Sequence, residues 1–103
     1  MSLSKELKRR AQDLTVLYVE DEDSTRNQIS QILKLFFKEV VVCENGFEAL
    51  QSYKQNSTDL VITDLTMPKM SGLEMVKKIK EFNHNQHAII LTAHNSSENL
   101  MQT

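Results

Sequence analysis

Three acidic side chains stand at the ends of two apolar runs, where a pair of strands would stop. Glu20 and Asp21 follow the run 16–19, and Asp64 follows the run 60–63. Negative charges gathered at one edge of a sheet repel each other by about 4 kcal/mol per pair, at a separation of about 4 Å and an effective dielectric of about 20. Such a cluster implies a bound cation, a shared proton or a chemical function if the two strands are neighbours.

The donor set indicates which cation would suit these carboxylates. No histidine or cysteine lies near them in the sequence, which favours a hard cation over zinc. Mg²⁺ fits best, because it keeps several waters and takes one or two carboxylates together with phosphate oxygens, whereas the EF-hand spacing typical of Ca²⁺ is missing. A carboxylate beside Mg²⁺ can also attack phosphorus to give an acyl phosphate. Asp64 is the best candidate for that nucleophile because it stands alone at its strand end.

The composition is that of one small globular domain. The chain has 103 residues, of which 40% are hydrophobic and 25% charged. Its net charge of −2 gives no reason to expect nucleic-acid binding, and the basic cluster near its start is typical of a solvated helical turn. The single cysteine, Cys43, reads as a core residue in a reducing compartment. Because the sequence has neither an apolar run of about 18 residues nor a signal-peptide core, we expect a cytoplasmic protein without membrane contact.

Apolar runs rich in β-branched residues alternate with stretches of helical period. The runs predict strands at about 15–19, 40–43, 60–63 and 88–91, with a helix in each interval. The first helix should have Asp23 or Ser24 as its N-cap and should end near Phe37. Ser96 or Ser97 would cap one further helix near the end of the chain.

Each expected helix has one apolar face. The faces consist of Ile29, Ile32, Leu33 and Phe36 in the first helix, Phe47, Ala49, Leu50 and Tyr53 in the second, and Met75, Val76, Ile79 and Phe82 in the third. Between the third strand and the third helix lies a loop at 65–72. Pro68 in this loop stops the strand and holds the preceding residue extended.

The alternation of strands and helices predicts an α/β fold with a doubly wound parallel sheet. In the flavodoxin-like strand order 2-1-3-4-5, strands 1 and 3 are neighbours, and ligands bind beyond the carboxyl ends of the strands. Under this order Glu20, Asp21 and Asp64 converge. Thr92 at the end of the fourth strand would offer a hydroxyl, and Ala93 a backbone N–H, to a phosphoryl oxygen at the same edge. Taken alone, a threonine at a strand end is more often a β-former or a helix cap.

Three segments resemble the receiver domain of bacterial response regulators, in order and in register. They are VLYVEDE at 16–22, DLVITDLTMPKMSG at 59–72 and AIILTA at 88–93. The D-x-x-M-P-x-x-x-G pattern, with the acid pair before it and LTA after it, makes chance a poor explanation. The resemblance implies a flavodoxin-like receiver domain at 14–103, preceded by an N-terminal extension at 1–13.

The resemblance also implies the roles of the strand-end acids. Asp64 would be the phosphoacceptor, and Glu20 with Asp21 would be the acid pair that organises Mg²⁺. The metal ligands would then be Glu20, Asp21, Asp64 and the backbone carbonyl of Thr66. Because the family often has aspartate at the first of these positions, Glu20 reaches one methylene further and would hold the metal through water.

The switch that the resemblance implies lies on the fourth strand. Thr92 would be the hydroxyl that moves to the phosphate, while the small Ala93 leaves room beside it and offers its N–H. The side chains of Thr66 and His94 match the variable positions that tune how fast the phosphoryl group is lost. A sensor histidine kinase or a phosphotransfer protein would phosphorylate Asp64, adding a charge of about −1.5 to −2 that biases a two-state surface. We therefore expect a signalling phosphoacceptor and not an enzyme.

The C-terminus departs from the family pattern. The fifth strand, the fifth helix and the lysine that pairs with the acceptor carboxylate have no counterpart in this sequence, since Lys69 and Lys77 read as solvated charges. An uncovered fourth strand would expose its backbone edge. Three readings remain: a longer protein shown in part, which we favour, a truncated protein, or a fragment completed by another chain through exchange or homodimerisation.

Two other functions compete with phosphoacceptance. A receiver-like docking module that is never phosphorylated is left open by the missing lysine, although the intact acids and Thr92 count against it. A phosphohydrolase of the haloacid dehalogenase type also uses a strand-end aspartate as its nucleophile. That class usually needs a second aspartate two positions further on, where this chain has Thr66.

Overall fold

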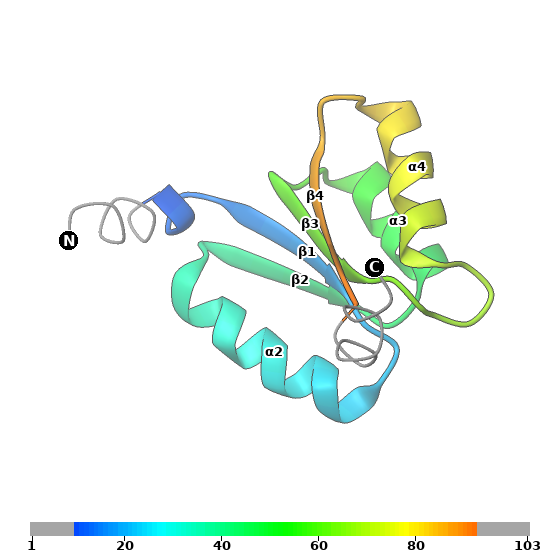
Figure 1. Cartoon of the computed structure of the whole chain (residues 1–103). Coiled ribbons are helices and arrows are strands. Elements are labelled where there is room, and N and C mark those ends of the chain that lie inside the picture. The colour runs from blue at the N-terminus through cyan, green and yellow to red at the C-terminus, as the bar shows by residue number, and fades with distance from the viewer. Residues whose placement is uncertain (1–9, 93–103) are drawn as a thin grey trace, which may run out of the picture.

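The computed structural model describes residues 10–92, which form a four-stranded parallel sheet with helices on both faces (Figure 1). The strands are β1 (Thr15–Val19), β2 (Glu39–Cys43), β3 (Leu60–Asp64) and β4 (His87–Leu91), and the helices are α2 (Asp23–Phe36), α3 (Gly46–Gln55) and α4 (Gly72–Phe82). The strand order is β2-β1-β3-β4, and every pairing is parallel. The prediction of a doubly wound α/β fold is thereby confirmed. Ala93 and the helix expected after Ser96 or Ser97 lie outside the described residues.

The sheet is covered on both faces, and β1, one of its two central strands, is the most buried element. Helices α3 and α4 lie on one face and α2 on the other (Figure 1). Val16, Leu17, Tyr18 and Val19 are each completely buried. Since consecutive side chains of a strand point to opposite faces, this run must be packed from both sides.

Two further features of the described residues were also predicted or can be compared with the sequence. Cys43 is buried, and this burial raises the pKa of its thiol to about 11, so the prediction of a core cysteine is confirmed. None of the helices within residues 10–92 has the length and apolar character that crossing a bilayer requires.

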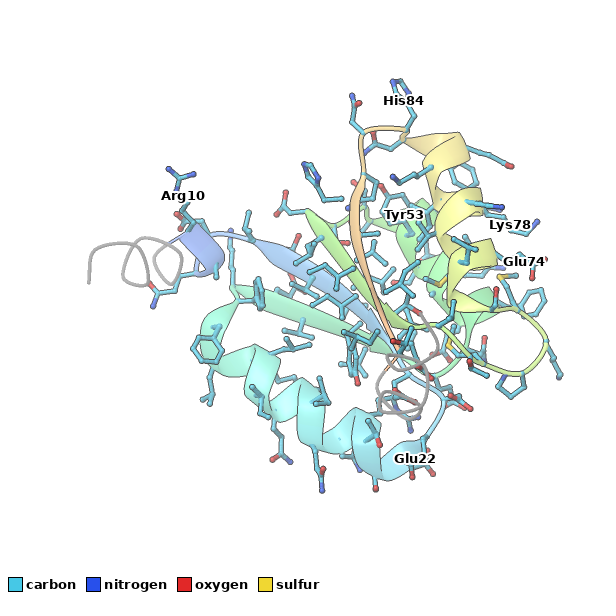
Figure 2. The ribbon with its side chains drawn as sticks, in the orientation of Figure 1. Arg10, Glu22, Tyr53, Glu74, Lys78 and His84 are labelled. Atoms are coloured by element: carbon cyan, nitrogen blue, oxygen red, sulfur yellow. The ribbon has the colours of Figure 1, made fainter. Side chains whose placement is uncertain are left out.

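The N-cap of α2 differs from the prediction. Glu22 caps the helix, because its carboxylate accepts a hydrogen bond of 2.7 Å from the backbone N–H of Thr25 (Figure 2). Asp23, one of the two predicted caps, instead lies in the first turn and pairs with the guanidinium of Arg26 at 2.6 Å. The helix therefore begins at Asp23, nearer the strand than either predicted cap would place its start.

The buried faces of the helices are narrower than their apolar patterns suggest. In α2, Ile29 and Leu33 pack on the sheet, but Ile32 is 50% exposed. The buried Ser30 shows that the contact with the sheet is centred on the other flank of the helix. Phe36 in α2, Phe47 in α3 and Phe82 in α4 are exposed as well, contrary to prediction. Helical period predicts which residues share a face, but not how much of that face is covered.

The loop between β3 and α4 is tightly folded against the end of β3. The N–H of Met70 bonds the carbonyl of Pro68 at 2.7 Å, and the residue between them, Lys69, has φ 71°. This is a γ-turn, a conformation that strains a residue other than glycine. The N–H of Gly72 donates to the carbonyl of Leu65 at 2.8 Å and closes the loop.

A buried glutamine ties the opposite edge of the sheet together. His84 marks the turn between α4 and β4 in Figure 2, and Gln86 follows it with only 4% of its surface exposed. Its side-chain oxygen accepts from the hydroxyl of Tyr53, and its Nε2 donates at 3.0 Å to the carbonyls of Asp59 and His87. Gln86 therefore links α3, the start of β3 and the start of β4.

Candidate functional site

The three strand-end acids converge at the carboxyl edge of the sheet. β1 and β3 are hydrogen-bonded neighbours, Glu20 directly follows β1, and Asp64 is the last residue of β3. One carboxylate oxygen from each of Glu20, Asp21 and Asp64 lies within 4.8 Å of the other two. Glu20 and Asp64 are each only 7% exposed. The proximity inferred from the strand order is therefore present.

Hydrogen bonds from α2 and β2 hold the acid pair in place. The N–H of Glu20 continues the sheet by bonding the carbonyl of Cys43 at 3.1 Å. Arg26 donates from Nη1 to the carbonyls of Glu20 at 3.0 Å and Asp21 at 3.4 Å. The carboxylate of Glu20 accepts from the N–H of Glu22 at 3.1 Å. Arg26 was not predicted as part of the site, and its place one turn into the helix is the only sequence signal for it.

The acids line a pocket of about 470 Å³. Thr66, predicted as a ligand through its backbone carbonyl, borders the same pocket. Leu91 lines it too, and Thr92, which directly follows Leu91, is exposed. The described part of the chain thus gathers four of the six predicted site residues around one pocket and brings Thr92 next to it, while Ala93 lies outside the described residues.

The electrostatics of the pocket favour a bound cation. Burial raises the pKa of Glu20, and the nearby charges of Asp64 and Asp21 raise it further, although the hydrogen bond from Glu22 opposes this. Burial, together with the negative charges of Glu20 and Asp64, raises the pKa of the Tyr18 hydroxyl to about 12. A divalent cation would offset the repulsion that these shifts report. The oxygen donors present therefore fit Mg²⁺ well.

Replacing Glu20 by glutamine should stabilise the protein in the absence of divalent cations. The folded-state pKa of Glu20 is raised, so its carboxyl stabilises the fold while protonated and loses this contribution as the pH rises through that pKa. In Glu20→Gln this loss should vanish, and the relieved repulsion is worth at least about 1 kcal/mol per charge pair. Urea unfolding in EDTA at pH 5 and pH 7 measures both effects.

The matched control is Glu22→Gln. Hydrogen bonds from Thr25 lower the pKa of Glu22, which caps α2, so its neutralisation should destabilise the protein at pH 7. Glu20→Gln and Glu22→Gln should thus shift the unfolding midpoint in opposite directions. If the wild-type protein is as stable as Glu20→Gln at pH 7, or more stable, the predicted repulsion between Glu20 and its acidic neighbours is wrong.

Comparisons with known proteins agree with this architecture. The family model described as the response regulator receiver domain matches residues 16–103. Chemotaxis protein CheY of Halobacterium salinarum is 38% identical over 85 residues, which are 82% of this chain and 71% of that protein. A cyclic di-GMP phosphodiesterase of Thermotoga maritima is 39% identical over 85 residues, but the chain spans only 23% of its length.

A solved structure shows the same fold. In the CheX–CheY–BeF3–Mg²⁺ complex from Borrelia burgdorferi, a chain of 30% sequence identity superposes with a TM-score of 0.75, covering 91% of this chain and 77% of the other. Receiver domains act as signalling modules that interact with a kinase or a phosphotransfer partner and bind Mg²⁺ at an acidic pocket. The matched residues run from β1 through β4 and include every strand-end acid described above. This chain belongs to the response regulator receiver domains of two-component systems.

Proposed function

We propose that this chain accepts a phosphoryl group on the carboxylate of Asp64, from a sensor histidine kinase or a phosphotransfer protein in the cytoplasm. The observation that carries the proposal is the convergence of Asp64 with Glu20 and Asp21 in one pocket. The related structure that contains BeF3 and Mg²⁺ supports it, because the fold is shared. The receiver would comprise residues 14–103, with 1–13 as an extension.

Phosphoryl transfer would use the carboxylates in two ways. Asp64 attacks phosphorus with one oxygen as the bond from phosphorus to the imidazole nitrogen of the donor breaks, and that nitrogen then takes up a proton. Asp21, Asp64 and the carbonyl of Thr66 would hold Mg²⁺, with Glu20 acting through water. The cation, when bound, offsets the negative charge of the phosphoryl oxygens.

The pocket would also respond to the new charge. A phosphoryl group adds about −1.5 to −2 charges beside two carboxylates, so hydrogen-bond donors must move toward it. The hydroxyl of Thr92 and the backbone N–H of Ala93 would be those donors. Movement at Thr92 would then pass into β4, which ends at the preceding residue.

Phosphorylation by a small phosphodonor tests this proposal. Wild-type protein incubated with Mg²⁺ and acetyl phosphate should gain the mass of one phosphoryl group, in a linkage that is labile to base. Asp64→Asn should gain none, and EDTA should prevent the gain in wild type. The matched control is Asp59→Asn, because Asp59 is an exposed aspartate next to the other end of β3 and should leave labelling intact.

Two outcomes would contradict phosphoacceptance at Asp64. One is equal labelling of Asp64→Asn and wild type. The other is a folded wild-type protein that binds Mg²⁺ but takes no phosphoryl group from acetyl phosphate. Far-ultraviolet circular dichroism of each variant establishes that the sheet is intact.

A further inference from the structure

Tyr18 carries a buried hydroxyl that none of the described residues 10–92 pairs with. The residue lies in the middle of β1 and is completely buried, yet its hydroxyl has no hydrogen-bond partner within the described part of the chain. Leaving a buried hydroxyl unpaired costs about 1–3 kcal/mol, and such groups are rare in folded proteins. A phenylalanine would fill the same space without this penalty. The hydroxyl therefore calls for a partner other than the described residues.

The position of Tyr18 indicates where that partner would lie. Side chains two residues apart on a strand share a face, so Tyr18 lies on the same face as Glu20. Tyr18 borders the acidic pocket together with Glu20, Asp21, Asp64 and Thr66. Its apolar ring packs with Val16 and Ile62 in the smaller core cluster. The tyrosine thus adds a phenol to a pocket that is also lined by four acidic residues and two threonines.

Water is the partner that this chemistry favours. A pocket of about 470 Å³ has room for several waters, and carboxylate and phenol oxygens can hold them. A water bound to a divalent cation directs its lone pair at the metal and both protons outward. Such a water needs acceptors, and the oxygen of Tyr18 is an acceptor on the same strand face as Glu20.

We infer that the Tyr18 hydroxyl is an outer-sphere partner of the divalent-cation site, where its oxygen accepts a hydrogen bond from a cation-bound water. Tyr18 is then a positioning residue, because it orients the water and does not touch the cation. The inference rests on the cation site of the proposed function, but not on phosphorylation. Outer-shell partners of this kind typically change metal affinity by about 10- to 100-fold when they are removed.

Tyr18→Phe separates this role from simple core packing. The variant keeps the ring and loses only the hydroxyl, so the metal-free protein should be at least as stable as wild type in urea. Its Kd for Mg²⁺ should nevertheless rise about tenfold, the lower end of outer-shell effects. A tyrosine that only fills the core would leave the Kd unchanged.

The chain offers a direct spectroscopic readout, because it contains two tyrosines and no tryptophan. In Tyr53→Phe the only remaining tyrosine is Tyr18, and Mg²⁺ should change the intensity of its fluorescence emission. In Tyr18→Phe the emission comes from Tyr53, near the opposite edge of the sheet, and Mg²⁺ should leave it unchanged. Tyr53→Phe should also bind Mg²⁺ with wild-type affinity, which makes it the matched control.

Titration of MgCl2 into the wild type and both variants by calorimetry and tyrosine emission decides the question. A tenfold weaker Kd for Tyr18→Phe, with wild-type affinity in Tyr53→Phe, supports the inference. Equal Kd values for wild type and Tyr18→Phe overturn it and leave the proposed function standing. A wild-type protein that binds no Mg²⁺ overturns the cation site itself.

Discussion

Gly72→Ala should destabilise the domain by about 3 kcal/mol, the upper end of what overpacking costs, and should also weaken Mg²⁺ binding. A Cβ on Gly72 would lie 2.1 Å from the carbonyl oxygen of Asp64 and 3.0 Å from Cγ2 of Thr63. Neither atom can yield easily, because β3 is hydrogen-bonded on both sides. The alanine must therefore push the loop away from the strand end or displace the backbone that carries the Asp64 carboxylate.

Gly46→Ala provides the matched control for this clash. A Cβ on Gly46 would lie 2.8 Å from the sulfur of Met70, but that sulfur belongs to a flexible side chain which can turn aside. Gly46 is also the first residue of α3, where alanine is a better helix former by up to about 1 kcal/mol. Urea unfolding followed by circular dichroism, with Mg²⁺ calorimetry, compares the two variants. A Gly72→Ala protein as stable as Gly46→Ala would contradict the predicted clash.

Gln86→Ala should lower the free energy of unfolding by about 4 kcal/mol, because several buried groups each lose a partner worth about 1–3 kcal/mol and a cavity remains. The groups left behind are the hydroxyl of Tyr53 and the carbonyls of Asp59 and His87. In a domain of about 100 residues, such a loss lowers Tm by roughly 15 °C or more. Calorimetric melting measures the change directly.

The effect of Gln86→Ala should be confined to stability. Gln86 precedes β4, at the edge of the sheet opposite the acids, so the Kd for Mg²⁺ should stay at its wild-type value below the melting temperature. Tyr53→Phe is the graded control, since it removes one hydrogen bond of the network, worth about 1 kcal/mol. A Gln86→Ala protein that melts together with Tyr53→Phe would show that the two carbonyl contacts contribute nothing.

The architecture of this domain was predictable because its signals are local. The strand runs are short, apolar and β-branched, and the helical periods fall between them, so each strand could be placed to within about one residue. The convergence of Glu20 and Asp64 then followed from the strand order alone. Hydrophobic periodicity thus predicted the elements, and the expected strand order predicted the site.

The contacts that lock these elements together were not predictable. Gln86 stands in a polar stretch with the composition of a solvated turn, and it is buried because Tyr53 and Asp59, distant in sequence, surround it. Arg26 likewise holds the acid pair by donating to backbone carbonyls, and every residue type has a backbone carbonyl, so the sequence gives no sign of this contact. Tyr18 was read only as part of an apolar strand. The partners are backbone carbonyls, a hydroxyl distant in sequence or a pocket, and none of these is visible in a local pattern of side chains.

The pairing of the two central strands has a consequence for what a bound ligand does to the whole molecule. β1 and β3 each have a hydrogen-bonded neighbour on both sides, and the acids stand at their ends. Such strands open only when the domain unfolds globally, not by local fraying. Any ion or covalent group that binds the acids of the folded state alone therefore raises the unfolding free energy of the entire domain. Amide hydrogen exchange in the buried strands should therefore slow when an ion or a covalent group binds the acids at the edge of the sheet, and its rate reports how far that site is occupied.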